Sequence, residues 1–287
     1  MSELPMQIYK AAMRYKTIEV DGLTLYPVLV IEYAEFSIAQ PALTVMHQSL
    51  PVAMMRMPLL SALYAMDFEA ASNGKPATGL FSRALLCLAL SLRIGESKSI
   101  EERMRAFQVL VDRENPAKLM GLRFVDADGK KRDITPVQYA NLRQIIAAQN
   151  GVKLEDDKAN PDIVKAQHDM ASASAKQLDT NIDDWISAIS ALTGTAEEEI
   201  DQWPILKFQR RSESLRRILD YLVCGFGEMN GTTWKGGNPT PHPFFAKAAD
   251  GNGVLTAMGG SADGEKPAPP QAATAIRDIT RTLQPQF

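Results

Sequence analysis

Apolar residues recur at intervals of three and four along much of the chain, the spacing that places them on one side of an α-helix. The pattern is clearest over residues 58–66, 182–192 and 205–223. Between residues 80 and 94 apolar side chains occupy nearly every side, which predicts a helix buried among other elements. The stripe of the segment Ile205–Val223 consists of Ile205, Phe208, Leu215, Ile218, Leu219 and Leu222. These patterns predict a mainly helical protein.

Three capping-box sequences indicate where helices begin. In such a box a Ser or Thr side chain and a Glu or Gln side chain three residues later each satisfy a free backbone N–H group. The boxes are Ser99–Glu102, Thr135–Gln138 and Thr195–Glu198. The first predicts a helix over Ile100–Asp112. The second predicts a helix that ends at Asn150-Gly151, since glycine is favoured just after a helix.

Two segments are typical of β-hairpins. Thr17–Tyr26 places short β-prone stretches on either side of Asp21-Gly22, a dipeptide that tolerates the positive φ angles of a tight turn. Leu122–Thr135 has apolar ends around a polar turn that contains glycine. A calcium loop is the alternative for this second segment. It lacks the oxygen ligands that calcium needs, because a glycine and three basic residues follow Asp128.

We therefore expect an α+β fold class, mainly α with small β-hairpins at 17–26 and 122–135, built as a helical bundle. The expected parts are an N-terminal helical domain over 1–160, a helical arm over 161–180, a C-terminal helical module over 181–245 and a flexible tail over 246–287. The tail is rich in Gly and Pro and poor in large apolar residues. Such a segment buries too little apolar surface to offset the loss of chain entropy.

The net charge of −3 over 287 residues gives no overall field that would hold nucleic acid or an acidic membrane. The longest apolar run, around Ala84–Leu92, is far shorter than the roughly 20 residues of a membrane-spanning helix. The first ten residues lack the pattern of a signal peptide. Cys87 and Cys224 lie within apolar runs, so we expect buried, reduced thiols. These features favour a soluble intracellular protein without a membrane partner.

Residues with catalytic or metal-binding chemistry are scattered. His47, His168 and His242 occur in separate segments, and none has a second ligand at a metal-binding spacing. The chain has no Gly-x-Ser-x-Gly elbow, phosphate-binding loop or dinucleotide fingerprint. Acidic pairs such as Asp183-Asp184 stand at expected helix starts, where the helix dipole favours acids. We expect no catalytic, metal or cofactor site and a non-enzymatic protein, with an enzyme whose site is dispersed along the chain as an alternative.

Several sequence blocks follow one another along the chain. LTLYPVLVIEYAEF (23–36) precedes PLLSALYAMDF (58–68), and ITPVQYANLRQIIAAQNGV (134–152) precedes NPDI (160–163). A short helix, a Glu-Glu-Ile turn and a helix with apolar residues and Phe then occupy 182–218, and GEMNGTTWKGG and HPFF close the series. This order over Val20–Phe245 resembles that of proteins encoded in phage tail gene clusters.

The resemblance implies a non-enzymatic tail assembly chaperone or baseplate-hub assembly protein. Its partners would be other phage tail or baseplate proteins, in the host cytoplasm during assembly or in the virion tail. The arm over 161–177 and the extension after Phe245 depart from the pattern, so a homo-oligomer is also open.

Aromatic residues beside glycine and proline at the edge of a domain are natural anchors for a partner. The candidates are Trp203, Phe208, Trp234, Phe244 and Phe245. Packing in the local core is an alternative for the first two. A different hypothesis is a nucleic-acid-associated protein that uses the basic face Arg210–Arg217. Glu213 and Asp220 interrupt that face, and no known nucleic-acid module accompanies it.

Overall fold

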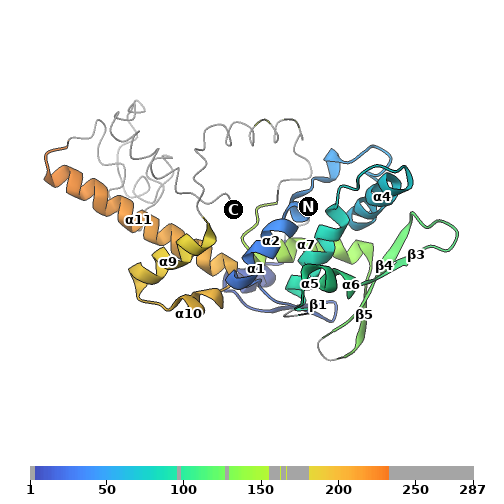
Figure 1. The fold of residues 1–287 in the computed structure, drawn as a ribbon, viewed down its shortest axis with the longest axis horizontal. Helices are drawn as coiled ribbons and strands as arrows, with labels where there is room; N and C mark the ends of the chain where they lie inside the picture. Colours follow the sequence, from blue (N-terminus) through green and yellow to red (C-terminus); the bar gives the residue numbers. More distant parts are fainter. Residues whose placement is uncertain are drawn as a thin grey trace. The chain divides into compact units, whose positions relative to one another are not determined.

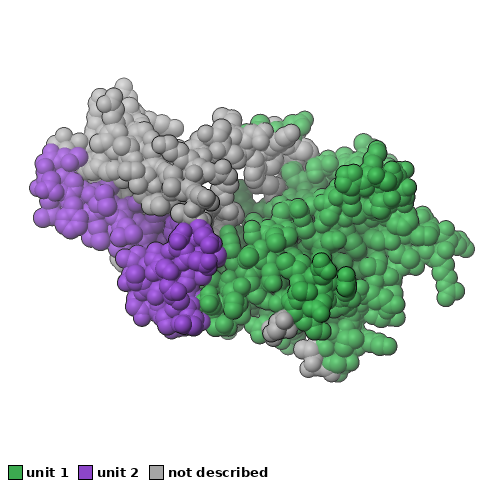
Figure 2. Space-filling model, viewed as in Figure 1, with its two compact units in different colours: residues 1–166, 201–208 green, residues 167–200, 209–287 purple. Residues whose placement is uncertain are grey.

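The computed structural model describes residues 4–95, 98–126, 129–154, 162, 166 and 181–232. The chain divides into two compact units (Figure 2): unit 1 comprises residues 1–166 and 201–208, and unit 2 comprises 167–200 and 209–287. Helices predominate and two small antiparallel sheets accompany them (Figure 1), which confirms the expected α+β class. The tail over 246–287 and, apart from 162 and 166, the arm predicted over 161–180 lie outside the described residues. So do the predicted domain boundaries near 160, 180 and 245.

Unit 1 contains most of the described helices and both sheets. Its helices are α1 (Met6–Met13), α2 (Tyr33–Ala39), α3 (Pro41–Thr44), α4 (Leu59–Ser72), α5 (Leu80–Ser91), α6 (Ile100–Arg105) and α7 (Pro136–Gln149), with short 3-10 turns η1 (Val30–Glu32) and η2 (His47–Ser49). The helices predicted over 58–66 and 80–94 and before Asn150-Gly151 are thus confirmed, as are the capping boxes of Ser99 and Thr135.

Helix α5 forms the centre of the unit 1 core. Every residue from Ala84 to Ser91 is buried, and the helix packs against α2, α3, α4 and α6. The Asp67 carboxylate of α4 accepts the backbone N–H groups of Gly79 and Phe81 at 3.1 and 3.2 Å, where α5 begins. An acid at this end satisfies free N–H groups and complements the helix dipole. The all-round apolar pattern of the sequence therefore corresponds to a helix covered by its neighbours.

The first hairpin consists of β1 (Ile18–Val20) and β2 (Leu23–Leu25), paired antiparallel with Val20 opposite Leu23. Asp21 and Gly22 both have positive φ, 50° and 73°, as expected for a two-residue turn of this type. The hairpin over 17–26 is confirmed. Ile18, Leu23 and Leu25 are buried in the unit 1 core.

The second sheet has three strands in the order β3 (Gln108–Val111), β4 (Leu119–Val125) and β5 (Lys131–Ile134). Pairing of β4 with β5 confirms the hairpin predicted over 122–135. Strand β3 shows that the helix predicted over Ile100–Asp112 is wrong beyond Arg105. The reason is that Val109–Val111 is a β-prone run, and β4 offers it backbone hydrogen bonds that outweigh the apolar helical spacing.

The end of α7 fastens the first hairpin and the loop after it. The Asn150 side chain accepts the Val28 backbone N–H at 2.9 Å and donates to the Ile146 carbonyl at 2.8 Å. Gln149 donates to the carbonyls of Lys16 and Leu25. Both amide side chains are fully buried. Two neighbouring polar residues therefore connect elements more than a hundred positions apart in the sequence.

Residues 201–208 return to unit 1 as a short antiparallel addition beside the loop after β2. Leu29 forms an isolated β-bridge with Pro204. The Val30 N–H donates to the Trp203 carbonyl and the Ile205 N–H donates to the Val28 carbonyl, both at 2.9 Å. Ile205 is fully buried in the unit 1 core. Residues 201–208 are therefore part of unit 1, although residues 167–200, which precede them in the sequence, belong to unit 2.

The helices described for residues 181–232 are α9 (Ile182–Thr193), α10 (Glu197–Asp201) and α11 (Ile205–Met229). The helix predicted over 182–192 is confirmed, and Gly194 ends it with φ of 69°. Helix α11 begins in unit 1 and continues in unit 2, and it extends past the predicted end at Val223. Within the described residues, no helix combines the length and apolar character needed to cross a membrane.

Candidate protein-contact surface

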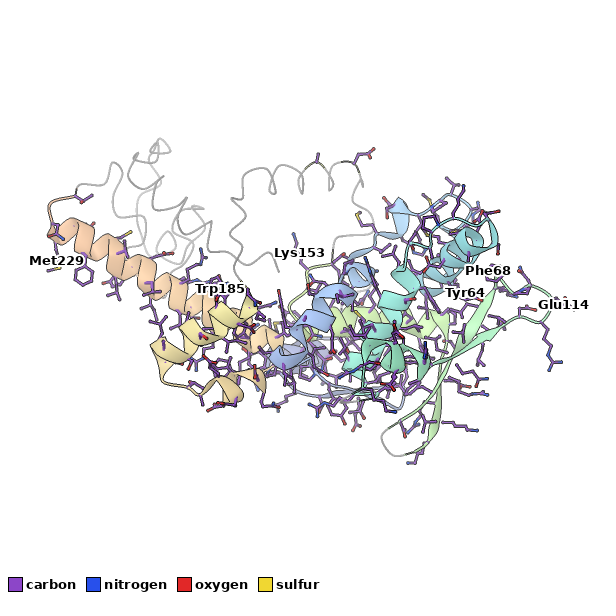
Figure 3. All side chains as sticks on the ribbon, in the orientation of Figure 1. Tyr64, Phe68, Glu114, Lys153, Trp185 and Met229 are labelled. Atoms are coloured by element: carbon purple, nitrogen blue, oxygen red, sulfur yellow. The ribbon has the colours of Figure 1, made fainter. Side chains whose placement is uncertain are left out.

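The second half of α11 carries a row of exposed apolar side chains. We call this row the α11 stripe, and it consists of Ile218, Leu219, Leu222, Val223, Phe226 and Met229. Their exposed fractions rise from 41% at Ile218 to 61% at Phe226 and 83% at Met229. Figure 3 shows Met229 at the far end of α11, with its side chain directed outward. Exposed apolar residues are ordinary when single, but a continuous set of them indicates a contact surface.

The stripe follows the geometry of a single helix face. At about 100° per residue, all its members except Val223 lie within an arc of roughly 100°, and Val223 borders that arc. The spacing is that of a heptad repeat whose a and d positions are occupied by Leu215, Leu219, Leu222, Phe226 and Met229. Cys224, which is 1% exposed, lies on the opposite side of the helix. The second half of α11 thus has one apolar exposed side that is regular enough to receive another helix.

The same heptad spacing begins earlier, where its residues are buried. Ile205 and Phe208 occupy the corresponding a and d positions and are 0% and 1% exposed. Ile205 packs in the unit 1 core. One apolar row is therefore covered at its start and exposed over its second half.

Charges divide unevenly along α11. Lys207 to Arg217 includes five basic residues and one acidic residue, whereas 218–229 includes two acidic residues and no basic one. Arg217 forms an ion pair with Glu213 one turn before it. Burial raises the pKa of Asp220 above its ordinary value, and Arg216 opposes that shift. Basic and acidic groups are thus separated along the helix. One arginine of the basic face considered for nucleic acid, Arg217, is already paired with an acid of the same helix.

The aromatic residues expected to bind a partner fall into two groups. Trp203 and Phe208 are 7% and 1% exposed, and the Lys207 ammonium lies 4.1 Å from the Trp203 ring centroid. Their burial fits the core packing that the sequence left open for them. Trp234, Phe244 and Phe245 lie outside the described residues, so their role as partner contacts stays a prediction.

Phe226 and Met229 were not predicted to belong to the surface. The predicted stripe ends at Leu222 and is followed by glycines at 225 and 227, which are poor helix formers, whereas the heptad spacing continues to Phe226 and Met229. That spacing is the signal that would have located the stripe.

A second apolar surface lies on unit 1 beside α1 and the end of α7. It is a groove of about 650 Å³. Its lining residues include Leu4, Met6, Tyr9, Met13, Ala147, Ala148, Val152 and Lys153. Met6 and Tyr9 are exposed, and Figure 3 shows where Lys153 lies. The groove supplies a further place where an apolar segment of a partner can bind.

Groups with reactive or metal-binding chemistry lie apart in the described part of the chain. His47 Nε2 lies 2.8 Å from the Met57 carbonyl oxygen. The Asp126 carboxylate accepts the Lys130 N–H and the Arg132 guanidinium, so the turn of the second hairpin uses it internally. Burial raises the pKa of the Cys87 thiol far above its usual range. No group of three His, Cys, Asp or Glu side chains among the described residues is arranged to hold a metal ion.

Comparison of the chain with protein-family models, with curated proteins and with solved structures finds no significant match.

Proposed function

We propose that this protein is a non-enzymatic assembly protein that acts through protein–protein contacts, and that its setting is phage tail or baseplate assembly. Its partners in this proposal are other tail or baseplate proteins, which it meets in the host cytoplasm. The protein acts there either as a chaperone or as a minor component of the tail.

The observation that carries the proposal is the α11 stripe. A helix with large apolar side chains exposed along one side gains free energy when a partner covers that side. The glycines Gly225 and Gly227 each cost a helix about 1 kcal/mol relative to alanine. A helix of this composition depends on packing against another surface for much of its stability. A partner that packs on the stripe supplies that support.

The phage setting comes from the order of blocks between Val20 and Phe245. In the fold these blocks correspond to the η1–α2 region, α4, α7 and the α9–α11 series. Within the middle block, Gln149 and Asn150 make the buried hydrogen bonds that hold the first block in place. The residue types that carry the resemblance therefore include ones that the fold of unit 1 needs.

The test is co-expression of the full chain with the proteins encoded by its neighbouring genes, followed by purification on a tag carried by this chain. We expect one tail protein to co-purify in a fixed ratio and to be lost from the double variant Leu222→Asp and Phe226→Asp. The matched control is Val137→Asp, which makes the same kind of change at a residue of α7 that is 71% exposed. Recovery that is the same for both variants would contradict the role of the stripe. Trp234→Ala with Phe245→Ala tests the predicted aromatic contacts in the same way.

Mass spectrometry of purified phage particles separates the two roles. Presence at a fixed copy number identifies a built-in component, and absence from particles whose assembly requires the protein identifies a chaperone. If loss of the gene leaves tail assembly unchanged, the proposed setting is wrong.

A further inference from the structure

We infer that the α11 stripe binds a second copy of this chain, and that the two α11 helices pack antiparallel about a two-fold axis beside Leu222. This inference rests on the proposed function because it names a partner for the same surface. It concerns the free protein, in which the second copy covers the stripe until a tail protein replaces it.

The heptad spacing supports a helix as the occupant. Leu215, Leu219, Leu222, Phe226 and Met229 occupy successive a and d positions, the pattern with which one helix packs against another of the same kind. From Leu215 to Met229 this seam is about 21 Å long at 1.5 Å per residue. A symmetric dimer needs a self-complementary patch. A seam with Leu222 at its middle meets that need, because Leu215 of one copy then lies level with Met229 of the second.

The direction follows from the charges. In a parallel pair the basic first halves of the two α11 helices would lie at the same level, and like charges repel. In an antiparallel pair centred at Leu222, Arg216 and Arg217 lie level with Glu228 of the second copy. The basic first half of each helix then faces the acidic second half of the other. Antiparallel helices also bring opposite ends of their dipoles together. The charge distribution therefore favours the antiparallel dimer.

The exposed area is sufficient for a weak dimer. At roughly 200 Å² for a fully exposed large side chain, the exposed fractions of the stripe correspond to about 650 Å² on one copy. Two copies would cover about 1,300 Å² in all, which exceeds the ~1,000 Å² expected of a specific interface and lies at the low end of its usual range. A dissociation constant on the order of 10 µM is consistent with such an area.

The experiment is sedimentation equilibrium of the full chain between about 1 and 200 µM, a range that brackets the expected dissociation constant. The apparent mass is expected to rise from 31.5 kDa toward twice that value. Leu222→Asp places a charge on the axis and is expected to weaken association at least tenfold, while Val137→Asp leaves it unchanged. Leu222 is already 44% exposed, so circular dichroism is expected to show an unchanged fold for the variant. A chain that stays monomeric at the highest concentration would overturn the inference.

Cysteine cross-linking tests the direction of the helices. Chains with Leu215→Cys and chains with Met229→Cys, distinguished by tags of different size, are oxidised alone and as a mixture. Antiparallel packing predicts a disulfide between the two different chains in the mixture and little cross-linking of either alone. Cross-linking of each variant with itself would show a parallel pair and overturn the antiparallel geometry. The native Cys87 and Cys224 are buried and serve as the unreactive background.

The dimer and the proposed function fail in different ways. A monomeric chain that still co-purifies with a tail protein contradicts the second copy and leaves the proposed function. A dimer that requires Leu222 but accompanies no tail protein supports the inference and contradicts the proposed function.

Discussion

Replacing Asn150 by alanine should destabilise unit 1 because it removes the partner of a buried backbone N–H group. Asn150 is completely buried, and its side-chain oxygen is the acceptor for the Val28 backbone N–H at 2.9 Å. Val28 is also completely buried, so water cannot replace the lost acceptor without a change in structure. The alanine variant therefore leaves a buried donor unpaired.

The magnitude follows from the groups that lose a partner. A buried N–H left without an acceptor costs about 1–3 kcal/mol, and the lost bond from the amide nitrogen to the Ile146 carbonyl adds about 1 kcal/mol. The Ile146 carbonyl keeps the bond from the backbone N–H of residue 150, so it adds no second unpaired group. We expect a loss of about 2–4 kcal/mol in the free energy of unfolding. At about 2–4 °C for each kcal/mol in a unit of this size, the melting temperature should fall by about 4–16 °C.

The assay is urea unfolding monitored by circular dichroism, with Asn73→Ala as the matched control. Asn73 also follows the last residue of a helix, but it is exposed. We expect that control to lie within about 0.5 kcal/mol of the wild type. If Asn150→Ala costs no more than Asn73→Ala, the hydrogen bond to Val28 does not hold unit 1 together and the reasoning is refuted.

Three further predictions concern unit 1. Tyr139→Phe should leave the free energy of unfolding unchanged or raise it by up to ~1 kcal/mol, because the buried Tyr139 hydroxyl has no hydrogen-bond partner among the described residues; a calorimetric loss above that size would show that the hydroxyl is bonded. The Cys87 thiol should react with a disulfide reagent at pH 8 only when the protein unfolds, since burial raises its pKa; rapid reaction of the native protein would contradict its burial. Arg123 donates to the Asp133 carboxylate at 2.7 and 2.8 Å and lowers the pKa of Asp133 below its ordinary 3.8. The pair therefore stabilises the protein above that pH and loses its effect as the pH falls further. Arg123→Ala should lower the melting temperature at pH 7 and leave it unchanged near pH 2, whereas an equal difference at both pH values would show that charge is not the cause.

Local rules predicted the elements that local chemistry decides. The boxes at Ser99 and Thr135 identify helix starts, and Asp21-Gly22 identifies a turn, because each depends on residues within four positions. Strand β3 was missed because its partner strand, rather than its own spacing, determines its conformation. For the same reason the sequence could identify Asn150 as a helix end but not as the partner of Val28.

The apolar row of α11 was predicted only in part. The sequence predicted an apolar stripe from Ile205 to Leu222. Whether each of its residues is exposed depends on which other elements pack against that part of α11. Ile205 and Phe208 are buried in a segment, 201–208, that belongs to unit 1. No local sequence pattern predicts that this segment packs there. The exposed half of this apolar row lies after residue 208, in unit 2.

The packing of residues 201–208 in unit 1 also determines when unit 1 can finish folding during synthesis. The hydrogen bonds that join Val28 and Val30 to Trp203 and Ile205 close a loop of roughly 175 residues, a costly contact for a chain to form early. While the protein is being made, the ribosome must release the segment beyond Ile205 before unit 1 can be completed. A nascent chain that stops short lacks both this closing segment and the α11 stripe. Truncated products would then be less stable, and under the proposed function they would also lack the surface that contacts a partner.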